Sequence, residues 1–192
     1  MEYKIILGIV AVAVGLISYA VYFRSIFYGR TKPHMFSWLV WGLLEGTAFF
    51  AQLSRGGGSG AWVTGATAAL CFVVFAAALK KGEKQITRLD WYSLLGAFLG
   101  LALWGVTSNP LIAVIIVSAT DFLGFVPTFR KSYHKPHEEA AMLYFLSIVK
   151  LVFALFALES FNPTTAIYPA TLVLTNAAFV AVLLVRRRST NL

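Results

Sequence analysis

Four ionisable or amide side chains stand inside apolar runs of this sequence, where such groups are costly. They are Glu45, Asp121, Lys150 and Asn176. A charged side chain at the centre of a bilayer costs at least about 2.5–3.5 kcal/mol on insertion scales, so each needs a compensating role. Groups of this kind bind a polar solute, carry a proton or pair with one another.

Counting along the chain places these four side chains at a similar depth. Each lies nine to eleven residues from the polar end of its apolar run. At about 1.5 Å per helical residue this distance is roughly 14–16 Å, close to the midplane of a bilayer. The four residues come from four different runs, so a helical bundle that packs these runs together would gather acid, base and amide groups in one place.

Aromatic residues accompany the acid of the second run. Trp38, Trp41 and Glu45 recur at intervals of three and four, so they share one face of a helix. A polar face on a spanning helix turns toward the bundle interior or a wet cavity, because lipid cannot satisfy it. We therefore expect a central site for a small polar solute, with Trp41 for stacking and Asn176 for hydrogen bonding.

Two other uses of the charged groups stay open. Lys150 could pair with Asp121 or Glu45 and hold the helices together, or one of the two acids could carry a proton. Three ionisable groups cannot all cancel in pairs, so at least one remains for binding or proton transfer.

The composition predicts an all-α integral membrane protein. Of 192 residues, 59% are hydrophobic and 12% charged, and the mean hydropathy is +0.77, whereas a soluble domain carries about 25% charged residues. Apolar runs about twenty residues long predict seven transmembrane helices. They cover residues 5–23, 35–54, 60–80, 89–107, 109–128, 139–158 and 163–185.

The charge distribution indicates orientation rather than nucleic-acid binding. The net charge is +8, but thirteen Lys and Arg residues fall on one side of the predicted spans, and only Lys4 and Arg55 on the other. The positive-inside rule therefore places the N-terminus outside and the C-terminus in the cytoplasm, in a plasma membrane of the bacterial inner-membrane type. Nucleic acid is not an expected partner.

Catalytic signatures do not accompany the buried carboxylates. The histidines have no thiol or carboxylate cluster at ligand spacing, the single Cys71 lies inside an apolar run, and no nucleophile or cofactor motif is present. We expect no enzyme activity, no metal and no cofactor. The segment RGGGSG, Arg55 to Gly60, lacks the Lys-Ser/Thr of a phosphate loop and is expected to be a flexible turn.

An internal repeat organises the chain. A shift of 106 residues places Phe129-Arg130 on Phe23-Arg24, and both copies are followed by Lys-Pro-His. Two units of three helices in the same orientation require one linking helix between them, giving parallel repeats in a 3+1+3 order. The expected units are residues 1–83 for the first triple-helix bundle, 84–108 for the linker helix, and 109–192 for the second bundle with its basic tail.

This topology resembles the SWEET and PQ-loop families, whose general architecture the KDEL receptor and bacterial nicotinamide-riboside transporters share. Where PQ-loop members carry Pro-Gln, the second unit has Pro127-Thr128 and the first has Val21-Tyr22. SWEET-like hinges use prolines, so the resemblance implies a gating role for Pro127. SWEET-like sugar sites combine tryptophan with asparagine, as Trp41 and Asn176 would here.

The expected function is transport of a small polar solute, sugar-like or vitamin- or amino-acid-like, by alternating access through the midplane site. The candidate binding residues are Trp38, Trp41, Glu45, Asp121, Lys150 and Asn176. The bilayer, a small-molecule substrate, a coupling proton and a second copy of the chain are the candidate partners. The alternative is a receptor or assembly factor on the same scaffold that binds without transporting.

Overall fold

The computed structural model describes residues 2–33, 35–82, 87–134, 136–138 and 140–190, without the side chains of several residues in α4 and α5. This described part is helical and contains no strand, which confirms the predicted all-α class. The α-helices are α1 (Glu2–Phe27), α2 (Met35–Ser54), α3 (Trp62–Lys81), α4 (Arg88–Thr107), α5 (Pro110–His134), α6 (Ala141–Ala157) and α7 (Pro163–Thr190). Two short 3-10 helices, η1 (Gly58–Ala61) and η2 (Pro136–Glu138), lie in the connections.

The helices follow the predicted apolar runs, but α1, α5 and α7 extend further; α1, expected over residues 5–23, covers Glu2–Phe27. The runs were expected to end at residues 128 and 185, whereas α5 continues to His134 and α7 to Thr190. Neither extension contains Gly or Pro, so nothing in it interrupts helical hydrogen bonding. Basic residues in a last turn also interact favourably with the negative end of the helix dipole. The predicted basic loop after residue 128 is therefore mostly helix.

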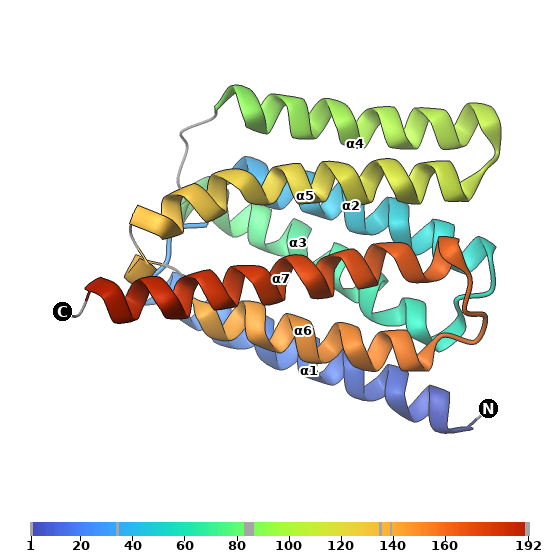
Figure 1. Ribbon diagram of the computed structural model, residues 1–192, viewed down its shortest axis with the longest axis horizontal. Coiled ribbons are helices and arrows are strands. Elements are labelled where there is room, and N and C mark those ends of the chain that lie inside the picture. The colour runs from blue at the N-terminus through green and yellow to red at the C-terminus, as the bar shows by residue number, and fades with distance from the viewer. Residues whose placement is uncertain (1, 34, 83–86, 135, 139, 191–192) are drawn as a thin grey trace.

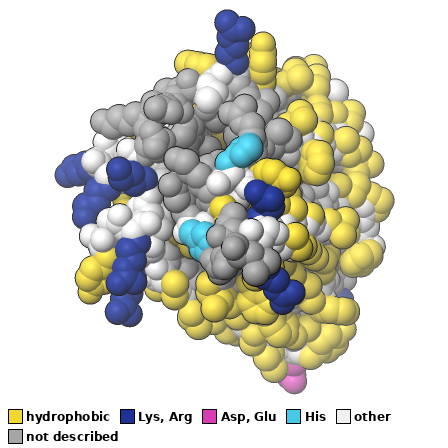
Figure 2. Space-filling model, turned by 60° about the vertical axis from the view of Figure 1, so that its left-hand side comes forward, with side chains coloured by type: hydrophobic (Ala, Val, Ile, Leu, Met, Phe, Trp, Pro, Cys, Tyr) yellow, Lys and Arg dark blue, Asp and Glu magenta, His cyan; other side chains and the backbone are white. Residues whose placement is uncertain are grey.

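The outer surface of the bundle suits a bilayer. Among the described residues, three helices are long and apolar enough to span a membrane: Glu2–Phe27, Gly58–Lys81 and Pro163–Ser189. Large apolar side chains on the flanks face outward; Leu174 is 71% exposed and Val106 is 84% exposed. Figure 2 looks toward one end of the bundle and shows Lys and Arg side chains there, bordered by an apolar flank. These features indicate a membrane protein.

The packing of the helices repeats itself. In the first half of the chain α3 packs against both α1 and α2, and in the second half α7 packs against both α5 and α6. Between the halves, α1 packs against α6 and α2 packs against α5. The pattern is symmetric: when α1, α2 and α3 are swapped with α5, α6 and α7 respectively, each of these helix–helix contacts corresponds to another contact that the structure also contains. Helix α4 lies at the edge of the bundle beside α5 (Figure 1).

The glycine-rich loop is a packed element, so the expected flexible turn is wrong. Ser59, Gly60 and Ala61 are buried in η1. Gly56 and Gly58 adopt positive φ values of 75° and 54°, which glycine accepts without steric cost. The glycines are used for tight turning and close approach to neighbouring backbone, rather than for mobility.

This loop joins the two halves of the chain at the end opposite the C-terminus. The Ser160 N–H donates to the Gly56 carbonyl over 3.0 Å, and Lys4 Nζ donates to the Leu158 carbonyl over 2.7 Å. Ser59 Oγ lies 3.1 Å from the Ala157 carbonyl oxygen. We call residues 55–61 and 157–162, together with Lys4, the glycine clasp.

Gly60 tests the close packing of the clasp. A Cβ at Gly60 would lie 2.6 Å from the Leu158 backbone nitrogen and 2.7 Å from the Ala154 carbonyl oxygen, whereas a Cβ at Gly46 of α2 meets nothing within 4 Å. Gly60→Ala should lower the free energy of unfolding by about 1–3 kcal/mol through overpacking. Gly46→Ala, the matched control, should leave it unchanged or raise it slightly. Denaturant unfolding of the purified protein in detergent measures both; equal effects would contradict the packing argument.

Candidate functional site

A cavity lies in the middle of the bundle, between the two halves of the chain. Side chains from α1, α2, α3, α5, α6 and α7 line it. It offers about 70 Å³ to the centres of water-sized molecules, several times the roughly 10–15 Å³ that one water requires. The cavity therefore has room for several waters or a very small solute in this conformation.

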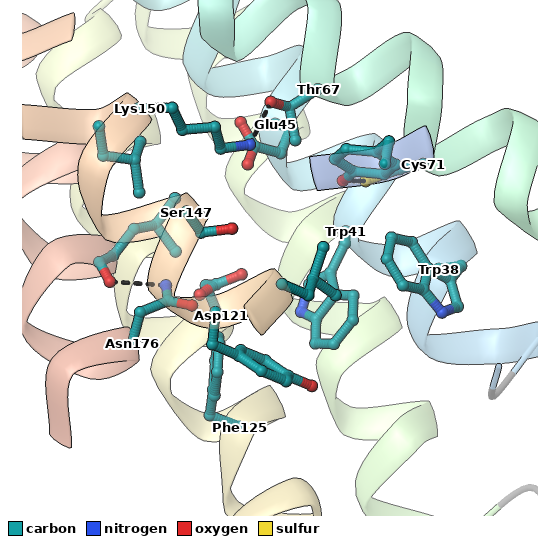
Figure 3. Close-up of a pocket in the computed structure, with 15 residues that line it drawn as sticks. Trp38, Trp41, Glu45, Thr67, Cys71, Asp121, Phe125, Ser147, Lys150 and Asn176 are labelled. Carbon is teal, nitrogen blue, oxygen red and sulfur yellow. Dashed lines mark hydrogen bonds between the residues drawn. The ribbon is translucent and has the colours of Figure 1, made fainter. Parts of the chain in front are cut away.

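The structure brings the six candidate binding residues together. Trp38, Trp41, Glu45, Asp121, Lys150 and Asn176 all line the cavity (Figure 3). The spacing argument on α2 is consistent with this placement, because residues three and seven positions apart share one face. Pro127 lies within the range of α5, but its side chain is outside the described part of the chain. Helix α7 carries an internal proline that the sequence reasoning did not single out, Pro169.

Lys150 is held at one side of the cavity by groups from the first half of the chain. Its Nζ donates to Thr67 Oγ1 over 2.7 Å, and the same hydroxyl donates to the Val63 carbonyl. The ammonium also lies 5.4 Å from the centre of the Tyr19 ring, a distance at which a cation is attracted to the ring face. Lys150 is only 3% exposed, so α1 and α3 supply the contacts that replace its hydration.

Glu45 lies beside this ammonium group (Figure 3). The two side chains interact electrostatically, but in the described part of the chain Lys150 makes its hydrogen bond to Thr67 and not to a carboxylate. Figure 3 shows Glu45 beside the Lys150–Thr67 hydrogen bond. The two opposite charges therefore lie near one another without a direct hydrogen bond between them, and pairing of these groups as a support for the helix packing stays an alternative.

Both acids of the cavity carry an oxygen with no hydrogen-bond partner. These atoms are Glu45 Oε2 and Asp121 Oδ2, and the two residues are 7% and 2% exposed. A buried acceptor without a donor costs about 1–3 kcal/mol, and more when it is charged. Because both acids line the cavity, water, a proton or a solute inside it can supply the missing partner.

Aromatic rings line the part of the cavity that lies toward the end of the bundle that holds the C-terminus. Trp41 packs against Trp38 with ring centres 5.2 Å apart and against Phe125 at 5.8 Å. Tyr144 and Phe179 continue the cluster at 4.4 Å. Trp38 and Tyr144 lie near the starts of α2 and α6, which identifies the end of the bundle. We call these five residues the aromatic cluster.

The asparagine and serine of the cavity complete its polar lining. Asn176 Nδ2 donates to the Leu172 carbonyl over 2.7 Å, one turn earlier on α7. Ser147, one turn before Lys150 on α6, also lines the cavity. In Figure 3 the side chains of Asn176, Ser147 and Asp121 point toward the same space. This part of the cavity can both donate and accept hydrogen bonds.

Several lining residues were missed by sequence reasoning. They are Tyr19, Thr67, Cys71, Tyr144 and Ser147. Threonine and serine in a spanning helix usually bond to a carbonyl one turn earlier, so they give no signal of a site. Tyrosine near the end of an apolar run is typical of a lipid interface. Only the hydrogen bond from Lys150 reveals the role of Thr67.

Comparisons with known proteins do not identify a relative of this chain. No family model, curated protein or solved structure matches the chain. Among the described residues, no group of three or more His, Cys, Asp or Glu side chains is arranged to hold a metal ion. The chemistry available in the described cavity is therefore that of two carboxylates, one ammonium group, hydroxyls, an amide and aromatic rings.

A double-mutant cycle tests the compensation between Glu45 and Lys150. Glu45→Gln and Lys150→Met should each lower the free energy of unfolding, because each leaves the other charge buried without its neighbour. The double variant should lose less than the sum of the two, with a coupling energy of about 0.5–3 kcal/mol. A cycle of Glu45→Gln with Lys4→Met, which lies in the glycine clasp, should be additive. Additive behaviour of the Glu45–Lys150 cycle would contradict their interaction.

Proposed function

We propose that this chain is a seven-helix membrane transporter that moves a small polar solute by alternating access through the central cavity. One observation carries the proposal: a cavity with two unpartnered carboxylate oxygens lies between the two halves of the chain. Both halves contribute to it, so a movement of one half against the other changes the access to the polar groups.

The proposal assigns α1–α3 and α5–α7 to two like-oriented units and α4 to the link between them. The helix packing supports this assignment, because each helix–helix contact has a counterpart when α1, α2 and α3 are swapped with α5, α6 and α7. The sequence repeat gives the same assignment independently. In transporters built from parallel repeats, substrate sites lie near the midplane at the interface of the repeats.

Different contacts join the two units at the two ends of the bundle. The glycine clasp joins the units at one end through backbone hydrogen bonds such as Ser160 N to the Gly56 carbonyl. The aromatic cluster joins them at the other end, because Trp41 belongs to the first unit and Phe125 to the second. In an alternating-access cycle one of these contacts opens while the other stays closed, so the solute meets the carboxylates from one side at a time.

The cavity charges can be tested by transport in proteoliposomes. A counterflow screen of sugars, amino acids, nucleosides, vitamins and small amines should give saturable exchange of at least one class. Glu45→Gln, Asp121→Asn and Lys150→Met should each reduce this exchange by at least about tenfold, because each removes a buried charged group from the site. Glu2→Gln, an acid-to-amide change at the exposed start of α1, is the matched control and should keep full exchange.

Saturable binding without exchange of any solute would contradict transport. It would favour the alternative of a receptor or assembly factor on the same scaffold. Thermal-shift measurements on the same variants separate a loss of the site from a loss of folding, because a ligand that binds only the native state raises its melting temperature.

Orientation gives a second test of the proposal. The excess of Lys and Arg at one end predicts that the glycine clasp faces the outside and the C-terminus the cytoplasm of a cell with a bacterial-type plasma membrane. Ser54→Cys and Ser189→Cys place thiols at exposed positions of the two ends, and the native Cys71 is buried. An impermeant maleimide should label Ser54→Cys in intact cells and Ser189→Cys only after permeabilisation. The reverse pattern would overturn the orientation.

A further inference from the structure

The charges that line the cavity do not balance. The described lining contains two carboxylates, Glu45 and Asp121, and one ammonium group, that of Lys150. Glu45 lies beside the hydrogen bond from Lys150 to Thr67 (Figure 3), so the opposite charges of Glu45 and Lys150 compensate one another. With both acids ionised, Asp121 is then left with an uncompensated negative charge at the middle of the bundle.

The surroundings of Asp121 supply no further cation. The titratable groups that line the same cavity are Tyr19 from α1, Glu45 from α2, Cys71 from α3, and Tyr144 and Lys150 from α6. Helix α7 contributes the neutral amide of Asn176 to the lining and, behind it, the buried phenol of Tyr168, which interacts with both acids but carries no positive charge. Helix α4 contributes nothing to the described lining. Lys150 already donates to Thr67. A positive charge that satisfies Asp121 must therefore come from outside the described lining.

Aromatic rings lie along the same wall as Asp121. Phe125 follows Asp121 by one helical turn on α5 and therefore shares its face. Its ring centre lies 5.8 Å from that of Trp41, and both rings line the cavity. The faces of aromatic rings attract cations that have left water. A carboxylate oxygen without a donor and an aromatic wall together suit a group that is positively charged and carries N–H donors.

We propose that the solute is a small organic cation of the alkylammonium or guanidinium class, bound by Asp121 and packed against Trp41 and Phe125. This inference rests on the proposed transport function, which it narrows to one class of substrate. The N–H donors of the cation supply the missing partner of Asp121 Oδ2. The amide of Asn176 and the hydroxyl of Ser147 provide further hydrogen bonds on the same side of the cavity.

The same charge balance couples the cation to a proton. An uncompensated carboxylate in a low-dielectric interior is unfavourable, so the empty site binds a proton at Asp121. When the cation binds, the Asp121 O–H bond breaks, its electron pair stays on the carboxylate, and the proton leaves to solvent. Each bound cation therefore releases one proton, and the two compete for the same oxygen atoms. The transporter exchanges cation for proton.

A charged probe and a neutral probe of the same shape test this proposal. Methylguanidinium and methylurea have nearly the same size and the same planar shape but differ by one positive charge. The neutral probe also carries a carbonyl oxygen where the cation carries an N–H2 group. Calorimetric titration of the purified wild-type protein should show saturable binding of methylguanidinium that is at least about tenfold tighter than that of methylurea. Its affinity should fall by up to about tenfold per pH unit as the solution is acidified, because protons compete for the site.

Asp121 variants and proton counting complete the test. Titrations in two buffers with different ionisation enthalpies should give one proton released per methylguanidinium bound. Asp121→Asn should remove the preference over methylurea and the proton release, whereas Asp121→Glu should keep both. If Asp121→Asn does not fold, the wild-type comparison of the two probes and the proton count still decide. Equal affinity for the two probes, binding of neither, or binding without proton release would overturn the proposal.

A failure of the cation-site proposal can be distinguished from a failure of the proposed transport function. Charge-selective binding of methylguanidinium without counterflow in proteoliposomes would overturn transport and leave the Asp121 cation site standing. Counterflow of a neutral or anionic solute that is unchanged in Asp121→Asn would overturn the cation site and leave transport standing. Uptake of methylguanidinium that is driven by an outward proton gradient in the wild type and lost in Asp121→Asn supports both the transport function and the cation site.

Discussion

The structure depends on one constraint: a polar group inside an apolar bundle must find its partners within the protein. Backbone groups meet the constraint through helices, and hydroxyls meet it by bonding one turn back, as Thr67 does to Val63. Ionised side chains cannot be satisfied this way. They require groups from other helices, so Lys150 on α6 reaches Thr67 on α3 and the face of Tyr19 on α1. The charged residues thus specify which helices must pack together.

The same constraint explains why different contacts join the two halves of the chain at the two ends of the bundle. At the glycine clasp, opening exposes backbone groups that water can satisfy, and each hydrogen bond there contributes a net free energy of only about 0.5–1.5 kcal/mol. At the aromatic cluster, opening would expose large rings such as Trp41 and Phe179, at about 25 cal/mol for each Å² of apolar surface. The contact between the halves is therefore favoured by apolar burial at the aromatic end and by several individually weak polar contacts at the clasp.

Much of the fold and part of the site follow from the sequence alone. The length of the apolar runs predicts where the helices lie. The free-energy cost of burying a polar side chain points to Glu45, Asp121, Lys150 and Asn176, which all line one cavity. The flexible turn at residues 55–60 was a wrong prediction, because composition cannot distinguish glycine used for mobility from glycine used for close packing. The hydrogen bond between Lys150 and Thr67 was equally unreadable, since it joins residues 83 positions apart. Contacts of this kind depend on side-chain placement and not on local pattern.

The proposed repeat offers a physical origin for the imbalance of charge. The shift of 106 residues places Asp121 of the second unit on Gly15 of the first. A Cβ at Gly15 would lie 3.5 Å from the Lys150 side chain. At this position α1 therefore packs against the aliphatic part of the lysine, whereas α5 carries an acid at the equivalent position. Glu45 and Lys150 lie at nearly equivalent places in their units and compensate one another. In the proposed two-unit arrangement the cavity is asymmetric, because a neutral contact on one side leaves a carboxylate on the other without an internal partner. An exactly symmetric pair of units would place two acids or two glycines there, and neither arrangement would give a single charge that a solute or a proton can neutralise.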